Sequence, residues 1–311
     1  MARDGEVVRR LRAAGAVIIG KTRMPAACCG LFGLKPERGR VTSAPMEHLW
    51  WAPGTTGPLS RSVLDSAIVY DVIRGGSAGD MFTAAEPATS FTEAARVEPA
   101  RLRIGWSTKP VTVGVRPDPA HVRAVRDTAR LLTGLGHDVR EVDPRYPDPT
   151  LAFVPQFFGG VRTESDGVER YDRLEKRTRQ LNRLGSWVCR PVIDRALRAG
   201  ERVSVKANRV FDEVDVLLTP TIAHRPPRTG ILDRGGPVHA CVKAVPMVAY
   251  SALWNVTGNP AASVSAGIGE DGLPLACQLV GRRGDETTLL SLSAQIESAQ
   301  PWSMPVMGVV G

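Results

Sequence analysis

The chain has 311 residues, of which 43% are hydrophobic and 23% are charged. A chain of this size and composition can bury a core, which excludes a disordered protein, a fibre and a small disulfide-stapled domain. No apolar run is long enough to span a bilayer, so we expect no membrane partner.

The net charge is +8, from 40 basic and 32 acidic residues. A basic chain can bind nucleic acid, but here arginines are interleaved with acids, as in Glu169-Arg170-Tyr171-Asp172-Arg173. Aromatic residues make up only 5% of the chain, which leaves few rings for base stacking. We therefore interpret the charge as an arginine-rich coding bias and expect no nucleic-acid partner.

Helices and strands are predicted to alternate along the first half of the chain. Asp4 is suited to cap a helix that Gly15 ends, and residues 16–20 follow as a short apolar strand. Ser60 is expected to open a second helix. Residues 77–100 are expected to form a surface connection. A further helix starts at Asp118-Pro119, between strands at 102–106 and 138–142.

The second half begins with a different pattern. Residues 150–210 are predicted to form Glu- and Arg-rich helices, with Leu174, Leu181 and Leu184 on one face. Strands at 214–218 and 275–280 and a closing helix capped by Asp285 follow. This alternation predicts an α/β protein, with one domain over 1–311 and a variable helical insert at about 150–210. The first helix is expected to have an apolar stripe, and the second an apolar side: Val7, Leu11 and Ala14, and then Val63, Leu64, Ala67, Ile68 and Val72. The later helices are expected to turn residues to the core: Val122, Val125, Ala129 and Leu132 at core spacing, and Leu289, Leu292 and Ile296 facing inward.

One exact pattern match concerns nucleotide binding. Gly15-Ala-Val-Ile-Ile-Gly20-Lys21-Thr22 satisfies the phosphate-loop expression G-x-x-x-x-G-K-[ST]. That loop needs a strand before it and a helix that starts at its lysine. Here a helix is predicted before the loop and a strand within it, so a helix–Gly–strand unit is the favoured interpretation.

The histidines and cysteines show no metal-ligand spacing. The five cysteines, at 28, 29, 189, 241 and 277, fit neither a metal site nor a disulfide framework, which favours a reducing cytoplasm. His137 is expected in a turn and His224 on a loop. Cys28 and Cys29 are expected to be small buried residues, because adjacent cysteines rarely bridge. We predict no metal and no cofactor.

Several segments resemble the amidase signature family, in the family's own order. The segment Arg23-Met-Pro-Ala-Ala-Cys-Cys-Gly-Leu-Phe-Gly-Leu-Lys-Pro36 is similar to the end of its signature, R-x-P-A-A followed by C-G-x-x-G-L-K-P. The helix–strand unit at 8–22 also resembles the family. The further matches are Gly57-Pro-Leu-Ser-Arg-Ser-Val-Leu-Asp65, Asp215-Val-Leu-Leu-Thr-Pro-Thr221, Asn255-Val-Thr-Gly-Asn-Pro-Ala-Ala-Ser263, Gly272-Leu-Pro-Leu-Ala-Cys-Gln-Leu-Val-Gly281 and Asp285-Glu-Thr-Thr-Leu-Leu290.

The resemblance implies α/β/α layers around a mixed β-sheet. It also implies hydrolysis of small-molecule amides without a metal, by a serine nucleophile, a second serine in a cis peptide and a lysine. Backbone amides of a Gly-rich loop would form the oxyanion hole.

The sequence departs from the family at the residues that catalyse the family's reaction. The family's G-G-S-S-G-G-S segment should fall between the G-K-T and P-A-A segments, yet Thr22 is followed directly by Arg23. Aligned on Arg23, the position of the nucleophile holds Lys21. The family lysine lies in a V-K-D motif upstream of the region that matches Asp4, so we expect it to be absent too. Of the nucleophile segment only Arg23 remains, as a candidate substrate-binding residue, and no catalytic residue is assigned.

We therefore predict a cytoplasmic amidase-family protein with an incomplete fold, truncated or internally deleted and inactive as written. The substrate and the oligomeric state stay open. One alternative is a non-catalytic relative that binds an amide-bearing ligand or a partner through its C-terminal half. The others are nucleotide binding at Gly15–Thr22, and a salvage mechanism with Cys28 or Cys29 as nucleophile and Lys21 as base.

Overall fold

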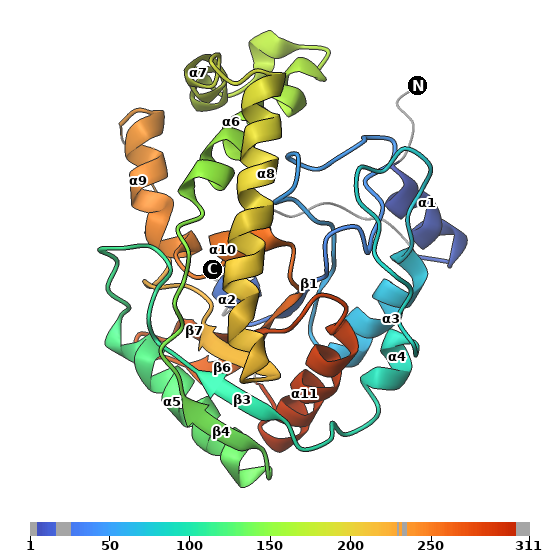
Figure 1. The fold of residues 1–311 in the computed structure, drawn as a ribbon, viewed down its shortest axis with the longest axis vertical. Helices are drawn as coiled ribbons and strands as arrows, with labels where there is room; N and C mark the ends of the chain where they lie inside the picture. Colours follow the sequence, from blue (N-terminus) through green and yellow to red (C-terminus); the bar gives the residue numbers. More distant parts are fainter. Residues whose placement is uncertain (1–4, 17–25, 229, 232–234, 303–311) are drawn as a thin grey trace, which may run out of the picture.

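A seven-stranded mixed sheet organises the chain (Figure 1). The computed structural model describes residues 5–16, 26–228, 230–231 and 235–302. The strand order is β2-β1-β6-β7-β5-β3-β4. β3 pairs in parallel with β4 and β5, and the other neighbours are antiparallel. The strands are β1 Phe32–Lys35, β2 Leu59–Ser60, β3 Arg103–Trp106, β4 Asp138–Glu141, β5 Val216–Pro220, β6 Ala261–Ile268 and β7 Pro274–Val280.

Helices supply the cover for both faces of this sheet. On the first face, α3, α4, α5 and α11 contribute to one large apolar core with alternate residues of the strands. On the second face, α10 and the end of α8 pack against the residues between them. The helices are α1 Glu6–Ala13, α2 Ala26–Cys29, α3 Val63–Ile73, α4 Phe91–Ala94, α5 Pro119–Gly134, α6 Thr150–Asp166, α7 Lys176–Leu184, α8 Arg190–Ala207, α9 Pro237–Val248, α10 Ala252–Thr257 and α11 Glu286–Ala299, with short 3-10 turns at Tyr171–Arg173 and Asn208–Asp212.

The predicted layers of helix, mixed sheet and helix are confirmed, as are the strands β3, β4, β5 and β7. The predicted helix from Asp118-Pro119 is α5, with Val125 and Leu132 fully buried. The closing helix is α11, preceded by Asp285 as predicted. Both helices pack on the first face. Their apolar residues recur at helical spacing, so each helix turns one apolar side to the core there.

Two expectations about boundaries were wrong. The N-cap of α3 is Ser62 rather than Ser60, because the Ser62 hydroxyl accepts the Asp65 amide at 3.1 Å. Ser60 instead pairs with Phe32 in the sheet. Residues 77–100 are not only a surface connection, since they contain α4 with the fully buried Phe91. Two residues expected on apolar helix faces, Ala14 and Ile68, are exposed. Instead of Ile68, α3 turns Val63, Ala67 and Tyr70 to the core.

Two expectations near the N-terminus fall wholly or largely outside the described residues: the cap at Asp4 and the strand at 16–20. The helix expected there is present as α1, and Gly15 follows it with a φ of +87°. Glycine adopts that left-handed conformation without a Cβ penalty, which is why it ends the helix.

The helices predicted at about 150–210 are α6, α7 and α8. In Figure 1, α8 runs up from the sheet, α7 lies near its far end, and α9 stands to the left of its upper half. α6 packs along α8, and α7 contacts α9. Leu174 precedes α7, so of the three leucines expected on one face only Leu181 and Leu184 belong to this helix. Leu184 is 44% exposed, so that face is only partly covered. Within the described residues, no helix is long and apolar enough to cross a membrane.

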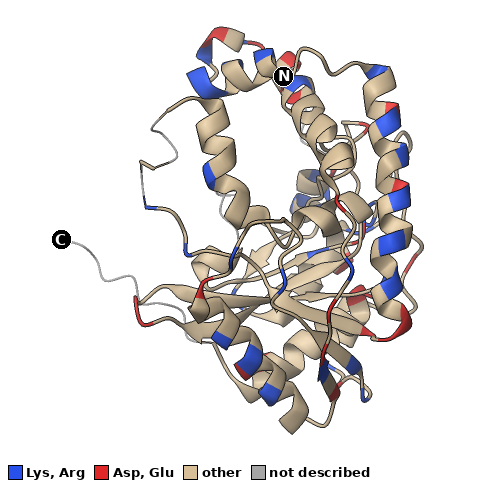
Figure 2. Ribbon diagram, turned by 60° about the vertical axis from the view of Figure 1, so that its left-hand side comes forward, with Lys and Arg blue, Asp and Glu red and all other residues tan. Residues whose placement is uncertain are grey.

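Charged residues lie mainly on the helices and connections (Figure 2). The central strands β5, β6 and β7 contain none. Basic and acidic residues are interleaved along the chain, as the sequence predicted. The central strands therefore bring only apolar and neutral polar side chains to the two faces.

Candidate functional site

A row of small and polar residues crosses four neighbouring strands on the second face of the sheet. Gly33 on β1 lies opposite Ser263 on β6, and Ser263 lies opposite Gln278 on β7. Gln278 in turn lies opposite Thr219 on β5. Residues directly opposite one another in paired strands point to the same face, so these four positions form one layer. We call Gly33, Ser263, Gln278 and Thr219 the polar row.

Hydrogen bonds hold the side chains of the polar row. The amide Nε2 of Gln278 donates to the Thr219 hydroxyl at 3.1 Å and to the Tyr250 carbonyl oxygen at 3.5 Å. The hydroxyls of Ser263 and Thr221 lie 3.5 Å apart. Thr219 and Gln278 are buried, and burial of polar groups is tolerated when they are paired in this way. The network holds the Gln278 amide and the Ser263 hydroxyl in position.

A cavity of about 310 Å³ lies over the polar row. That volume is at the lower end of the range found for small-molecule sites. Its walls combine apolar surface, including Trp254 of α10 and Leu59 of β2, with a few polar groups. The polar residues among its lining are Lys35, Thr55, Thr221, Ser251, Asn255, Ser263 and Gln278.

Lys35 of β1 is the one lysine among the described residues that line this cavity. Its Nζ donates to the carbonyl oxygen of Pro36 at 3.0 Å. Burial, the largest cause, and the charge of Arg38 lower its pKa, which comes to about 7. The carboxylates of Glu286 and Glu37 act in the opposite direction. The amine is therefore available in both its neutral and charged forms near neutral pH.

The substrate-binding candidate Arg23 and the candidate base Lys21 lie outside the described residues. Cys28 and Cys29 are on α2, which lines the cavity through Ala26 and not through either thiol. Both are free, as expected, but they are only partly buried, whereas the sequence predicted buried cysteines. Burial raises the pKa of both thiols, which lowers the thiolate fraction that a cysteine nucleophile needs.

The nucleotide-loop pattern also falls mostly outside the described residues. Helix α1 lies directly before Gly15, where a phosphate loop requires a strand. That order agrees with the helix–Gly–strand interpretation.

The histidines lie in separate places. His137 follows Gly136 at a turn as expected, but it is buried and bonded to the Leu102 amide and to Gln295. His224 is exposed on its loop and contacts the Arg116 carbonyl oxygen at 2.9 Å. Within the described part of the chain, no group of three or more His, Cys, Asp or Glu residues is placed to hold a metal ion.

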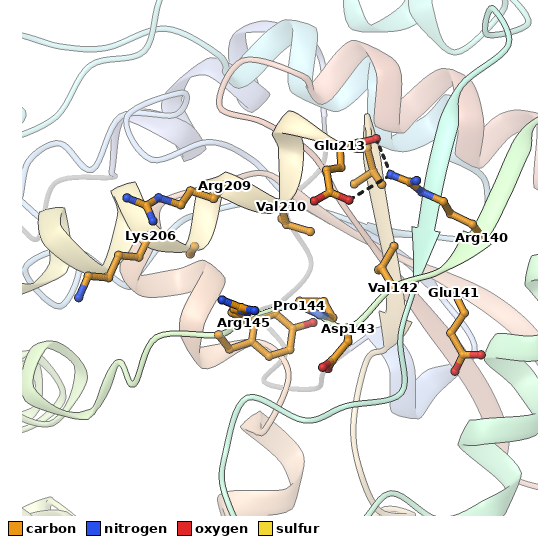
Figure 3. Close-up of a pocket in the computed structure, with 13 residues that line it drawn as sticks. Arg140, Glu141, Val142, Asp143, Pro144, Arg145, Lys206, Arg209, Val210 and Glu213 are labelled. Carbon is orange, nitrogen blue, oxygen red and sulfur yellow. Dashed lines mark hydrogen bonds and ion pairs between the residues drawn. The ribbon is translucent and has the colours of Figure 1, made fainter.

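A larger cavity of about 720 Å³ lies between residues 140–146 and the end of α8 (Figure 3). In Figure 3, Arg140 and Glu213 point toward each other, in agreement with their 3.2 Å ion pair. Lys206 and Arg209 extend at the other end of the view. Tyr146 of this cavity packs edge-on against Trp254 of the smaller cavity, with ring centroids 6.4 Å apart. None of the residues that line it was singled out in the sequence.

Sequence reasoning missed Thr219, Ser263 and Gln278 as site residues, although they lie inside the motifs that carry the family resemblance. The available signal is a polar residue within an apolar strand, as in Leu275-Ala-Cys-Gln278-Leu-Val. Their shared face depends on strand register, which no single segment reveals.

A mixed sheet covered by helices on both faces, with a partly polar cavity on one of them, defines a protein of the α/β class. The chain belongs to the amidase family, whose model matches residues 22–290. It is 39% identical over 363 residues to "Putative amidase AmiB2" of Mycobacterium tuberculosis, covering 96% of this chain and 76% of that protein.

Two further comparisons involve 6-aminohexanoate-cyclic-dimer hydrolase. The chain is 30% identical to that enzyme from Paenarthrobacter ureafaciens, covering 91% of this chain and 62% of the relative. A solved structure of such a hydrolase with substrate superposes with a TM-score of 0.81 at 28% identity, over 91% of this chain and 63% of the other. This chain thus spans less than two thirds of the hydrolase's length. The match to AmiB2 extends over more residues than this chain contains, so AmiB2 has residues within the matched region that lack a counterpart here.

Proposed function

We propose that this chain binds a small amide-bearing molecule over the polar row and does not hydrolyse it. The observation that carries the proposal is a polar row fixed by hydrogen bonds under a cavity of about 310 Å³. An amide ligand needs both a donor and an acceptor, and the Gln278 amide and Ser263 hydroxyl offer both. The hydrolase relatives act on such molecules, which supports the ligand class.

The proposed loss of hydrolysis rests on the junction between Thr22 and Arg23. The Ser/Gly-rich segment of the family, with its nucleophile, bridging serine and oxyanion amides, has no counterpart there. The extra residues of AmiB2 within the matched region support this assignment. Loss of a single oxyanion donor lowers the rate by about 10² to 10³, and here the nucleophile is missing as well.

Titration calorimetry with simple aliphatic and aryl amides, and with the 6-aminohexanoate cyclic dimer, tests the binding. We expect at least one amide to bind, and Gln278→Ala to weaken its binding by about tenfold through loss of a hydrogen bond. The exposed Gln300→Ala variant is the matched control and should bind unchanged. Absence of binding by every amide would reject the binding site.

The same panel measured for turnover tests the loss of chemistry. We expect no hydrolysis above the rate without protein. Turnover that survives Lys21→Ala and Cys29→Ala would show an active centre of another kind and overturn the proposal. The nucleotide sequence around codons 22–26 adds an independent check, because a Ser/Gly-rich stretch there would restore the family's usual machinery.

We further propose a cytoplasmic location and no nucleic-acid partner. All five cysteines are free, in keeping with a reducing compartment. Acidic residues lie among the basic ones on α8 and on several connections (Figure 2). Fractionation of cells and a filter-binding assay with mixed DNA and RNA check the two statements.

A further inference from the structure

The alternation of strand β1 directs Lys35 to the cavity. Phe32 and Leu34 are buried in the core of the first face, with exposed fractions of 0% and 4%. Side chains alternate along a strand, so Lys35 lies on the second face with Gly33. It pairs with Ala261 and is therefore diagonal to Ser263 of the polar row. The cavity lining includes Lys35 and Ser263.

The surroundings of this amine favour its neutral form. The hydrogen-bond acceptor of Nζ is a neutral carbonyl oxygen, that of Pro36. Removal from water and the positive charges of Arg38 and Arg283 lower the pKa of Lys35 to about 7, against the opposing charges of Glu37 and Glu286. An exposed lysine ordinarily titrates near 10.4. Close to half of the Lys35 amines are therefore nucleophilic at pH 7, against roughly one in 2,500 for an ordinary lysine.

We propose that Lys35 forms an imine with small neutral aldehydes or ketones that enter the cavity over the polar row. The amine lone pair attacks the carbonyl carbon, and the new C–N bond gives a carbinolamine whose oxygen takes up a proton. The hydroxyl then leaves as water with a second proton, and the C=N bond forms. One amine and one carbonyl are consumed, one imine and one water are produced, and no oxidant or reductant is needed. The inference requires the cavity but not amide binding.

The chain suits a site-resolved test because it contains only six lysines. The folded protein is incubated with benzaldehyde, the imine is reduced in place by sodium cyanoborohydride, and each lysine is quantified by peptide mass spectrometry. The hydride reduces the imine carbon, leaving a stable benzyl-lysine. Lys109 and Lys206 are the internal references, because both are exposed.

We expect Lys35 at pH 7 to be labelled about tenfold faster than either reference lysine. Its labelling should reach half of the maximum near pH 7, whereas the references should continue to gain label toward pH 10. Equal or slower labelling of Lys35 would overturn the proposal, as would a Lys35 profile that rises only toward pH 10.

Two variants connect the reactivity to this position. Lys35→Arg should remove the fast-labelled site and leave Lys206 unchanged. Ser263→Leu should fill the cavity beside the amine and slow the labelling of Lys35 alone; unchanged labelling in Ser263→Leu would contradict the proposed route of entry. Since wild-type protein gives the main result, a folding defect in a variant does not affect it. Labelling without amide binding rejects only the proposed function, and amide binding without fast labelling rejects only this inference.

Discussion

Alternate residues of the same strands point to the two faces of the sheet, and the two faces differ in the polarity of the residues they cover. On β7, Cys277 and Leu279 enter the apolar core of the first face, while Gln278 between them enters the polar row of the second. The first face is closed by helices whose apolar residues are at or near zero exposure. The second face combines a smaller apolar cluster with a cavity and the half-buried Lys35. The larger apolar core and the proposed binding site thus lie on opposite sides of one set of strands.

The largest expected effect lies at the edge of the first face, where Glu286 begins α11. Its carboxylate accepts Arg40 Nε at 2.8 Å and the Glu37 amide at 3.1 Å, and both side chains of the ion pair are buried. Glu286→Ala should lower the free energy of unfolding by about 3–5 kcal/mol, because Arg40 remains buried without its partner. Denaturant titration measures this. The variant pair Arg40→Met with Glu286→Leu should recover much of the loss, and a loss below about 1 kcal/mol in Glu286→Ala would contradict the assignment.

Adjacent residues of β7 give the direct comparison of the faces. Leu279→Ala should cost about 2–5 kcal/mol of unfolding free energy, since it leaves a void in a closed core. Gln278→Met, which keeps the volume, should cost about 1 kcal/mol, the net value of its hydrogen bonds. Thermal and denaturant unfolding of both variants measure the two losses of unfolding free energy. Equal costs would mean that the second face is as closely packed as the first.

The next effect concerns pH and Lys35. Its folded-state pKa is lowered to about 7, so the unfolded chain binds more protons between that value and about 10.4. Stability should therefore rise with pH across this window, by about 1 kcal/mol per pH unit at most. Lys35→Met should flatten the slope measured by denaturant titration at pH 7 to 9. The exposed Lys206→Met is the control, and an unchanged slope in Lys35→Met would show that the amine is not desolvated.

The smallest effect is expected from His121 of α5, behind the first face. Its ring is buried, neither ring nitrogen has a hydrogen-bond partner among the described residues, and burial lowers its pKa. The unfolded chain therefore binds the proton more readily below about pH 6.5, and stability falls as the pH is lowered through that window. His121→Leu should reduce the loss between pH 7 and 5 by about 1 kcal/mol or less. The exposed His239→Ala should leave the slope unchanged.

Much of the fold could be predicted from the sequence because its elements have strong periodic patterns. The residues Val125, Leu132, Leu289 and Ile296 mark α5 and α11 by helical spacing, and they are buried as expected. The strands β1 and β6 were missed for a physical reason. β1 has only four residues, including a glycine, and β6 is rich in alanine, serine and glycine, which give little β signal.

The candidate site was harder to predict than the fold. The family resemblance directs attention to Lys21, Arg23, Cys28 and Cys29, which lie at or near the Thr22–Arg23 junction. The polar row draws on four strands, and Gly33 is 230 residues from its partner Ser263. A shift of one residue in any strand would turn its polar side chain to the other face, so only the register brings the row together.

The strand order also has a consequence for synthesis. β6 and β7 lie between β1 and β5, so β1 leaves the ribosome about 230 residues before its neighbour β6. At roughly 5–20 residues per second, that interval is on the order of 10 to 50 seconds. During it the edge of β1 that will pair with β6 is open to other chains in the crowded cell. The central place of the last two strands therefore makes the nascent chain a candidate client for chaperones until its C-terminal quarter has emerged.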